Sequence, residues 1–72
     1  MARYFFHLRD GTDHLDHDGV ELPDDEVRGT AVTAAGEAIR DLGAQFFDHD
    51  GWRFWVTDEA GNTVCTLTLS GS

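Results

Sequence analysis

Cysteine is nearly absent from this sequence. Cys65 is the only cysteine in 72 residues, so no disulfide can form within the chain. Its place in an alternating strand pattern is typical of a small buried hydrophobic residue. No apolar run approaches the roughly 20 residues of a membrane-spanning helix, and the start of the chain has no signal-peptide pattern. We therefore expect a cytoplasmic protein.

Lysine is missing altogether, and five arginines and four histidines stand against 14 carboxylates, for a formal net charge of −9. Such a charge repels phosphate backbones and anionic membrane surfaces, so we expect neither nucleic acid nor a membrane as a partner. A basic protein or a cation would be attracted instead. Negative charge also keeps a small protein soluble, with no partner involved.

The length allows one small domain, residues 1–72, with a frayed tail at 70–72. A core of this size supplies only about 3–5 kcal/mol, which favours reinforcement by association or by a metal. Strand patterns, turn signals and one helical pattern alternate along the chain. They predict an α+β fold of order β-β-α-β-β, a four-stranded antiparallel sheet of order 2-1-3-4 with one helix on one face. The strands are expected at 3–9, 12–17, 52–58 and 63–69, and the helix at 24–42.

The predicted helix has one apolar stripe, formed by Val27, Ala31, Ala35 and neighbouring small residues. Asp24 is the expected N-cap, and Gly43 is a typical residue after a helix C-terminus. Gly29, Gly36 and Gly43 are seven residues apart, opposite the stripe. They indicate either a solvated face that tolerates glycine or a close-approach groove for another helix.

One helix covers one face of a sheet, which leaves the second face to be explained. Alternation places Phe5 and His7 of the first strand there, with Trp55 and Thr66 of the last two strands. Aromatic rings on an uncovered sheet are typical anchors of protein contacts. We expect these four residues to form an interface, most simply between two copies of the chain, although a partly polar face also tolerates two aromatic rings.

Histidines flanked by carboxylates occur in two Asp-His-Asp-Gly tetrapeptides, at 16–19 and 48–51. If the two loops converge, imidazole and carboxylate groups suit zinc or nickel. Residues 14–25 also match part of a calcium loop, although the first ligand is His and the last is Asp instead of Glu. Turn formation alone also favours Asp and Gly at such places. The metal candidates are His14, Asp16, His17, Asp18, His49 and Asp50.

Catalytic signatures are missing. The sequence contains no nucleophile elbow, no phosphate-binding loop and no dinucleotide fingerprint. Paired carboxylates occur in every acidic loop and carry no information of their own. We expect no enzyme activity and no cofactor.

Three segments carry a resemblance to a known family: Arg-Tyr-Phe-Phe at 3–6, Gly-Val-Glu-Leu-Pro-Asp at 19–24 and Asp-Glu-Ala-Gly at 58–61. Over nearly its whole length the chain resembles short alphaproteobacterial proteins catalogued as a domain of unknown function. The resemblance implies a bacterial, cytoplasmic, stand-alone domain. It implies no activity, and no catalytic or binding residues carry over from it.

The function predicted from the sequence is a non-enzymatic interaction module that is homodimeric and binds a protein through the aromatic sheet face or an edge strand. Two alternatives stay open. One is a metal- or cation-responsive module that uses the acidic, histidine-containing loops. The other is an antitoxin-like or regulatory domain that neutralises a basic partner, an idea that depends on fold-level analogy alone.

Overall fold

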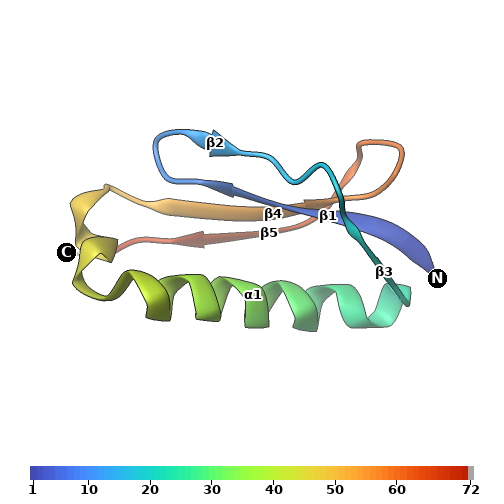
Figure 1. Ribbon diagram of the computed structural model, residues 1–72, viewed down its shortest axis with the longest axis horizontal. Helices are drawn as coiled ribbons and strands as arrows, with labels where there is room; N and C mark the ends of the chain where they lie inside the picture. The colour runs from blue at the N-terminus through green and yellow to red at the C-terminus, as the bar shows by residue number, and fades with distance from the viewer. Residues whose placement is uncertain (72) are drawn as a thin grey trace.

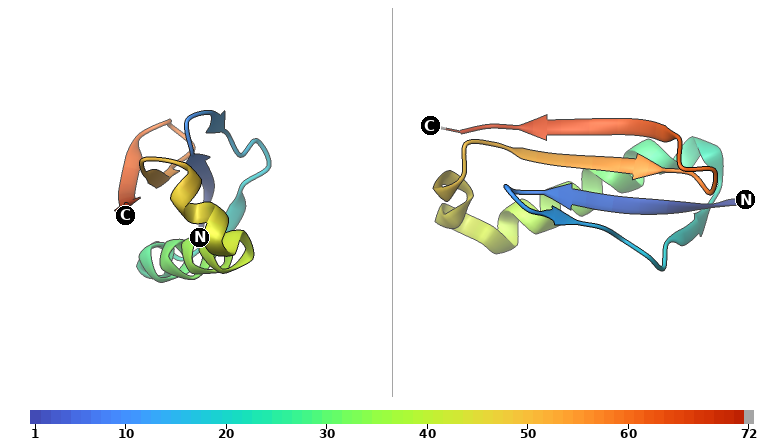
Figure 2. Two further views of the ribbon diagram at one scale, coloured as in Figure 1. Left: turned by 90° about the vertical axis from the view of Figure 1, so that its left-hand side faces the viewer. Right: turned by 90° about the horizontal axis from the view of Figure 1, so that it is seen from above.

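An antiparallel sheet forms one layer of the molecule, and a single long helix packs on one side of it (Figures 1 and 2). The computed structural model describes residues 1–71. The strand order β2-β1-β4-β5 is the predicted order, and the α+β fold is confirmed. The elements are β1 (Ala2–Arg9), β2 (Asp13–His14), β3 (Val20–Leu22), the 3-10 helix η1 (Asp24–Glu26), α1 (Val27–Leu42), the 3-10 helix η2 (Gly43–Asp48), β4 (Trp52–Thr57) and β5 (Thr63–Leu69).

The fifth strand, β3, was not predicted. Expected strand 12–17 is reduced to β2, which pairs only with the C-terminal end of β1. The N-terminal half of β1 pairs instead with β3, with Tyr4 opposite Val20. Between these two short partners the Asp16 carboxylate accepts the backbone N–H of Phe6, at 3.2 Å. A side chain thus replaces the backbone hydrogen bond of a paired strand at Phe6, which explains why β2 ends before residue 17.

The prediction of Asp24 as the helix N-cap is wrong. Pro23 precedes η1, and among the described residues no side chain forms a capping hydrogen bond to η1 or α1. The Asp24 carboxylate accepts a hydrogen bond from the Tyr4 hydroxyl on β1 instead. Asp24 therefore ties the start of the helix to the sheet, and the acidic residues of η1 still lie at the positive end of the helix dipole.

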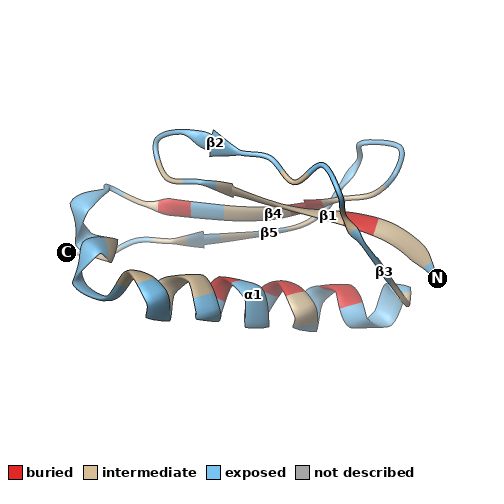
Figure 3. Cartoon of the chain, in the orientation of Figure 1, coloured by how far each residue is buried: buried red, intermediate tan, exposed pale blue. Residues whose placement is uncertain are grey.

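The core lies between α1 and the sheet (Figure 3). Val27, Ala31 and Ala35 of the predicted stripe are buried, as are Tyr4 and Val56 of the sheet. The small alanine side chains let the helix lie close to the strands. Cys65, expected to be buried, is only half-buried and packs against this cluster.

A further buried side chain, Trp52, extends the core toward the far end of α1. The helix ends at Gly43, as expected, where φ is +57° and the backbone N–H donates to the Ile39 carbonyl. The chain then continues into η2, whose Phe46 ring stacks on Trp52 with centroids 6.0 Å apart. The indole N–H donates to the Phe46 carbonyl at 2.9 Å. Gly71 of the expected frayed tail lies against the Phe46 ring, and Ser72 is outside the described residues.

Candidate functional site

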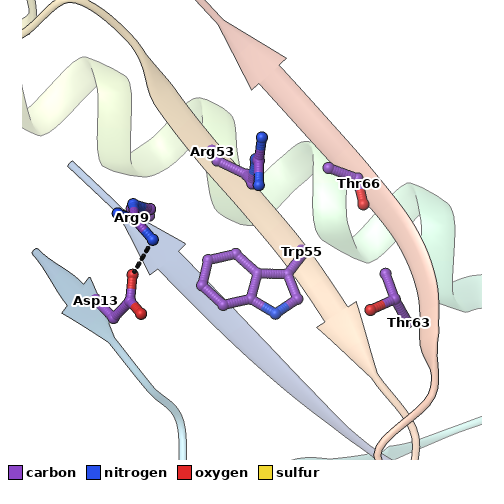
Figure 4. Close-up of a pocket in the computed structure, with 6 residues that line it drawn as sticks. All are labelled: Arg9, Asp13, Arg53, Trp55, Thr63 and Thr66. Carbon is purple, nitrogen blue, oxygen red and sulfur yellow. Dashed lines mark ion pairs between the residues drawn. The ribbon is translucent and has the colours of Figure 1, made fainter. Parts of the chain in front are cut away.

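The sheet face opposite α1 carries the four residues predicted to form an interface. In the strand register, His7 lies opposite Trp55, and Trp55 lies opposite Thr66. Phe5 lies opposite Thr57, two residues further along each strand and therefore on the same face. The structure therefore brings the four residues together on one face, and the Trp55 indole lies on the side of the sheet away from α1 (Figure 4).

This face is less bare than the sequence indicates, because the segment between β2 and β3 covers part of it. A Cβ atom added at Gly19 would lie 2.9 Å from the Phe5 ring, so the backbone there is in close contact with that ring. Asp16 holds the segment in place. Its carboxylate accepts the backbone N–H groups of Asp18 and Gly19 in addition to that of Phe6. Phe5, His7 and Trp55 are all half-buried; their interface role stays a prediction.

The same contacts set the charge of Asp16. Burial alone would raise the pKa of this carboxyl, but the three backbone N–H groups stabilise the anion more strongly and hold the pKa below its ordinary value. Asp16 is therefore ionised, and backbone N–H donors stabilise its negative charge. A carboxylate whose oxygens already accept three hydrogen bonds is a poor candidate for the proposed calcium or transition-metal ligand.

His7 and Thr57 form a pair on this face with a geometry like that of a base and a nucleophile, with Nε2 and Oγ1 2.9 Å apart. The Asp16 backbone N–H donates to the His7 Nδ1 at 3.1 Å. A neutral imidazole carries one proton, so Nδ1 as acceptor places that proton on Nε2. Nε2 then donates to the Thr57 hydroxyl and cannot accept its proton. The pair fixes the His7 ring and its tautomer.

Arginines are the feature of this face that the sequence analysis did not single out. Arg9 lies directly opposite Arg53 in the sheet. Arg9 Nη1 pairs with Asp13 at 3.3 Å, in a solvent-exposed ion pair. Both arginines line a hollow of about 330 Å³ together with Asp13, Trp55, Thr63 and Thr66 (Figure 4). Alternation alone places Arg9 and Arg53 on the same face as Trp55. That the two arginines are direct neighbours follows only from the register of β1 against β4.

The metal candidates are distributed over separate places. His17 and Asp18 are exposed in the segment between β2 and β3. The second tetrapeptide lies instead beside the turn between β1 and β2, where residues 48–51 line a hollow of about 290 Å³ with Asp10 and Gly11. His49 lies edge-on to Trp52. Within residues 1–71, no three His, Cys, Asp or Glu side chains are grouped so as to hold a metal ion.

His14 contacts a carboxylate outside the candidate set. Its Nε2 lies 3.2 Å from the Asp10 carboxylate. Burial would raise the pKa of Asp10, but the Thr12 backbone N–H and the neighbouring His14 lower it below its ordinary value. The contact lies at the turn between β1 and β2 and helps to fix that turn.

The fold and the site define a small α+β domain with one helix, an antiparallel sheet and a polar-aromatic open face. The chain belongs to the family described as Domain of unknown function (DUF6894), whose model matches residues 3–70. This match confirms the resemblance to a family of unknown function, while the alphaproteobacterial origin stays a prediction. No curated protein and no solved structure matches the chain. None of the helices within residues 1–71 combines the length and the apolar character that crossing a bilayer requires.

Proposed function

We propose that this domain is a non-enzymatic interaction module that forms a homodimer through the edge of β5. The observation that carries the proposal is the open edge of this strand. β5 pairs with β4 on one side, and no other strand within residues 1–71 pairs with it on the other. A seven-residue edge strand presents a row of free backbone N–H and C=O groups, which is a template for pairing with another strand.

Edge strands are ordinarily protected by charged side chains, proline or bulges. The sequence of β5, Thr-Val-Cys-Thr-Leu-Thr-Leu, contains no charge and no proline. The one irregularity in its pairing lies at its start, beside the Val56–Thr57 step of β4. The rest of the strand is regular and unprotected, so it can accept a second strand along most of its length.

Charge favours a second copy at this edge over other surfaces of the chain. Two copies with a formal charge of −9 each repel one another. β5 contains no acidic residue, so pairing there places no carboxylate of one β5 strand against the other. A two-fold antiparallel pairing centred on Thr66, the middle of the strand, would extend the sheet across both copies.

An apolar groove beside β5 gives the second copy more to bury. Arg28 and Val32 of α1 line a hollow of about 310 Å³ with Cys65, Thr66 and Leu67. Val32 is 58% exposed, although it is an apolar residue next to the core. A dimer that shields this groove would add to the core of a domain that buries only about 60% of its unfolded surface.

The absence of enzyme activity is part of the proposal and is supported by the state of His7. As described above, its Nδ1 is already used as an acceptor, so the ring cannot act as a base toward Thr57. Cys65 packs against the core. Both observations support a function without nucleophilic catalysis.

Sedimentation analysis of the purified chain at high micromolar concentration tests the proposal. The double variant Thr66→Glu, Thr68→Glu places like charges on neighbouring strands of the dimer and is expected to be monomeric and folded. The matched control Thr33→Glu, Gln45→Glu adds the same charge at two exposed positions away from β5 and is expected to remain dimeric. Mixing the β5 glutamate variant with Thr66→Lys, Thr68→Lys should restore a dimer, because opposite charges then face each other.

A monomeric wild-type chain at high micromolar concentration would refute the proposal, as would a β5 glutamate variant that dimerises as well as the wild type. A Phe5→Ser, Trp55→Ser variant distinguishes the two surfaces. Loss of the dimer in this variant, with the β5 glutamate variant still dimeric, would assign the interface to the sheet face.

A further inference from the structure

Two arginines lie directly opposite each other on neighbouring strands, and one carboxylate pairs with one of them. Arg9 and Arg53 are cross-strand partners in the pairing of β1 with β4. Like charges directly opposite each other destabilise a sheet. Asp13 pairs with Arg9 at 3.3 Å, whereas within residues 1–71 the Arg53 side chain forms no ion pair and no hydrogen bond. One positive charge of the pair is left uncompensated, in a chain with 14 carboxylates.

The arginines lie at a hollow that has the other parts of a ligand site. Its volume of about 330 Å³ is at the lower end of the range for small-molecule pockets. Trp55 lies among the lining residues, with Thr63 and Thr66 of β5 on one side, Arg9 and Asp13 on the other, and Arg53 next to it along β4 (Figure 4). The threonine hydroxyls are hydrogen-bond donors, and the indole is a flat surface for stacking.

We propose that this hollow binds a small organic anion that carries a phosphate or carboxylate group on a flat ring. Arg9 and Arg53 bind the anionic group, because guanidinium groups form charge-assisted, bidentate hydrogen bonds with such oxyanions. Trp55 stacks on the ring. All six lining residues belong to one chain, so the site goes beyond the proposed dimer and does not depend on it.

Asp13 acts as an internal competitor in this site. Its carboxylate occupies Arg9 in the free protein, in an ion pair that is exposed to water on both sides and therefore weak. A ligand must displace this carboxylate or share Arg9 with it. Removing the charge of Asp13 should therefore strengthen binding, whereas removing the charge of Arg53 should weaken it. Charge alone predicts the same two directions, because Asp13→Asn raises the net charge by one unit and Arg53→Gln lowers it by one. A defined site is distinguished by Arg40→Gln, which lowers the net charge by the same unit outside the hollow and should leave binding unchanged.

Titration calorimetry with three probes tests the proposal: adenosine monophosphate supplies ring and anion, adenosine the ring alone, and inorganic phosphate the anion alone. Adenosine monophosphate is expected to bind at least about tenfold more tightly than either of the others, since stacking on an aromatic side chain and charge-assisted hydrogen bonds both contribute. Arg53→Gln should weaken its binding about ten- to hundredfold. Asp13→Asn should tighten it, and Arg40→Gln, a matched change at an exposed helix position, should leave it unchanged.

The absence of saturable heat with both adenosine monophosphate and inorganic phosphate would overturn the proposal. Equal binding to the wild type and to Arg53→Gln would do so as well, as would weaker binding to Asp13→Asn. Phosphate that binds as tightly as adenosine monophosphate would overturn the role assigned to Trp55. Circular dichroism of each variant establishes that it is folded.

Discussion

The helical glycines allow a quantitative test of the packing described above. Gly29 and Gly36 lie inside α1, and a Cβ atom added at either position would meet no atom within 4 Å. Glycine in a helix interior costs about 0.8–1 kcal/mol relative to alanine. Replacing both by alanine should therefore stabilise the protein by about 2 kcal/mol, a large part of the roughly 3–5 kcal/mol that a core of this size supplies.

Thermal and urea unfolding followed by circular dichroism measure this effect. For a domain of this size, 1 kcal/mol raises Tm by about 4–8 °C, so the double variant should unfold about 8–16 °C above the wild type. Protein concentration must be the same in all samples, because the Tm of a dimer depends on it. Repeating the comparison in the Thr66→Glu, Thr68→Glu background removes this dependence.

Gly43→Ala is the matched control, since this glycine also has no atom within 4 Å of an added Cβ. Its φ is +57°, where L-residues are strained by about 1–2 kcal/mol, so alanine should destabilise here. Alanines at 29 and 36 that left stability unchanged, or lowered it, would refute the reasoning. That result would mean that another helix approaches this face closely, which is the groove interpretation of the glycine pattern.

Further predictions concern the contacts that hold the sheet and its covering segment. Gly19→Ala should destabilise by about 1–3 kcal/mol in urea unfolding, because φ is +70° and the added Cβ would lie 2.9 Å from the Tyr4 carbonyl oxygen. Asp16→Ala should destabilise by about 1–2 kcal/mol through loss of an acceptor for three backbone N–H groups. The pKa of Asp16 is lowered on folding, so Asp16 stabilises the folded protein above its ordinary pKa of 3.8. This contribution is lost as the pH falls through the pKa of the folded state. Asp16→Ala should lack this loss of stability in acid. The pKa of Tyr4 is raised from 10.0 to about 12, chiefly by its hydrogen bond to Asp24, so its stabilisation is present below pH 10 and is lost as the pH rises toward 12. Tyr4→Phe should remove this alkaline dependence, measured by unfolding between pH 9 and 12.

Hydrophobic alternation was sufficient to assign the long strands and their faces. Trp55 lies on the side away from α1 (Figure 4), and Phe5 shares that face in the strand register, as alternation predicts; the apolar stripe of the helix faces the core. The hairpin between β4 and β5 also forms where the turn residues indicate, with Asp58 accepting the backbone N–H groups of Ala60 and Asn62. These features depend on residues close together in the sequence, which is why the sequence predicts them.

The errors arose where a side chain binds a backbone or a side chain far away in the sequence. The Asp16 carboxylate accepts the Phe6 N–H, 10 residues earlier, and shortens the second strand. Asp24 binds the Tyr4 hydroxyl instead of capping its own helix. β3 is only three residues long and carries no alternation that can be distinguished from a turn. The pairing of Arg9 with Arg53 requires the register of two strands that are more than 40 residues apart.

The two buried alanines of α1, Ala31 and Ala35, have a consequence for how this family can vary. Where a helix rests on strands through methyl groups, each position is limited by volume as much as by polarity. When every amino acid is tested at these positions, leucine and phenylalanine should destabilise the protein as strongly as aspartate. Alanine at these two positions therefore fixes the spacing between the layers, and sequences that share the spacing should retain small residues there even where the rest of the helix has changed.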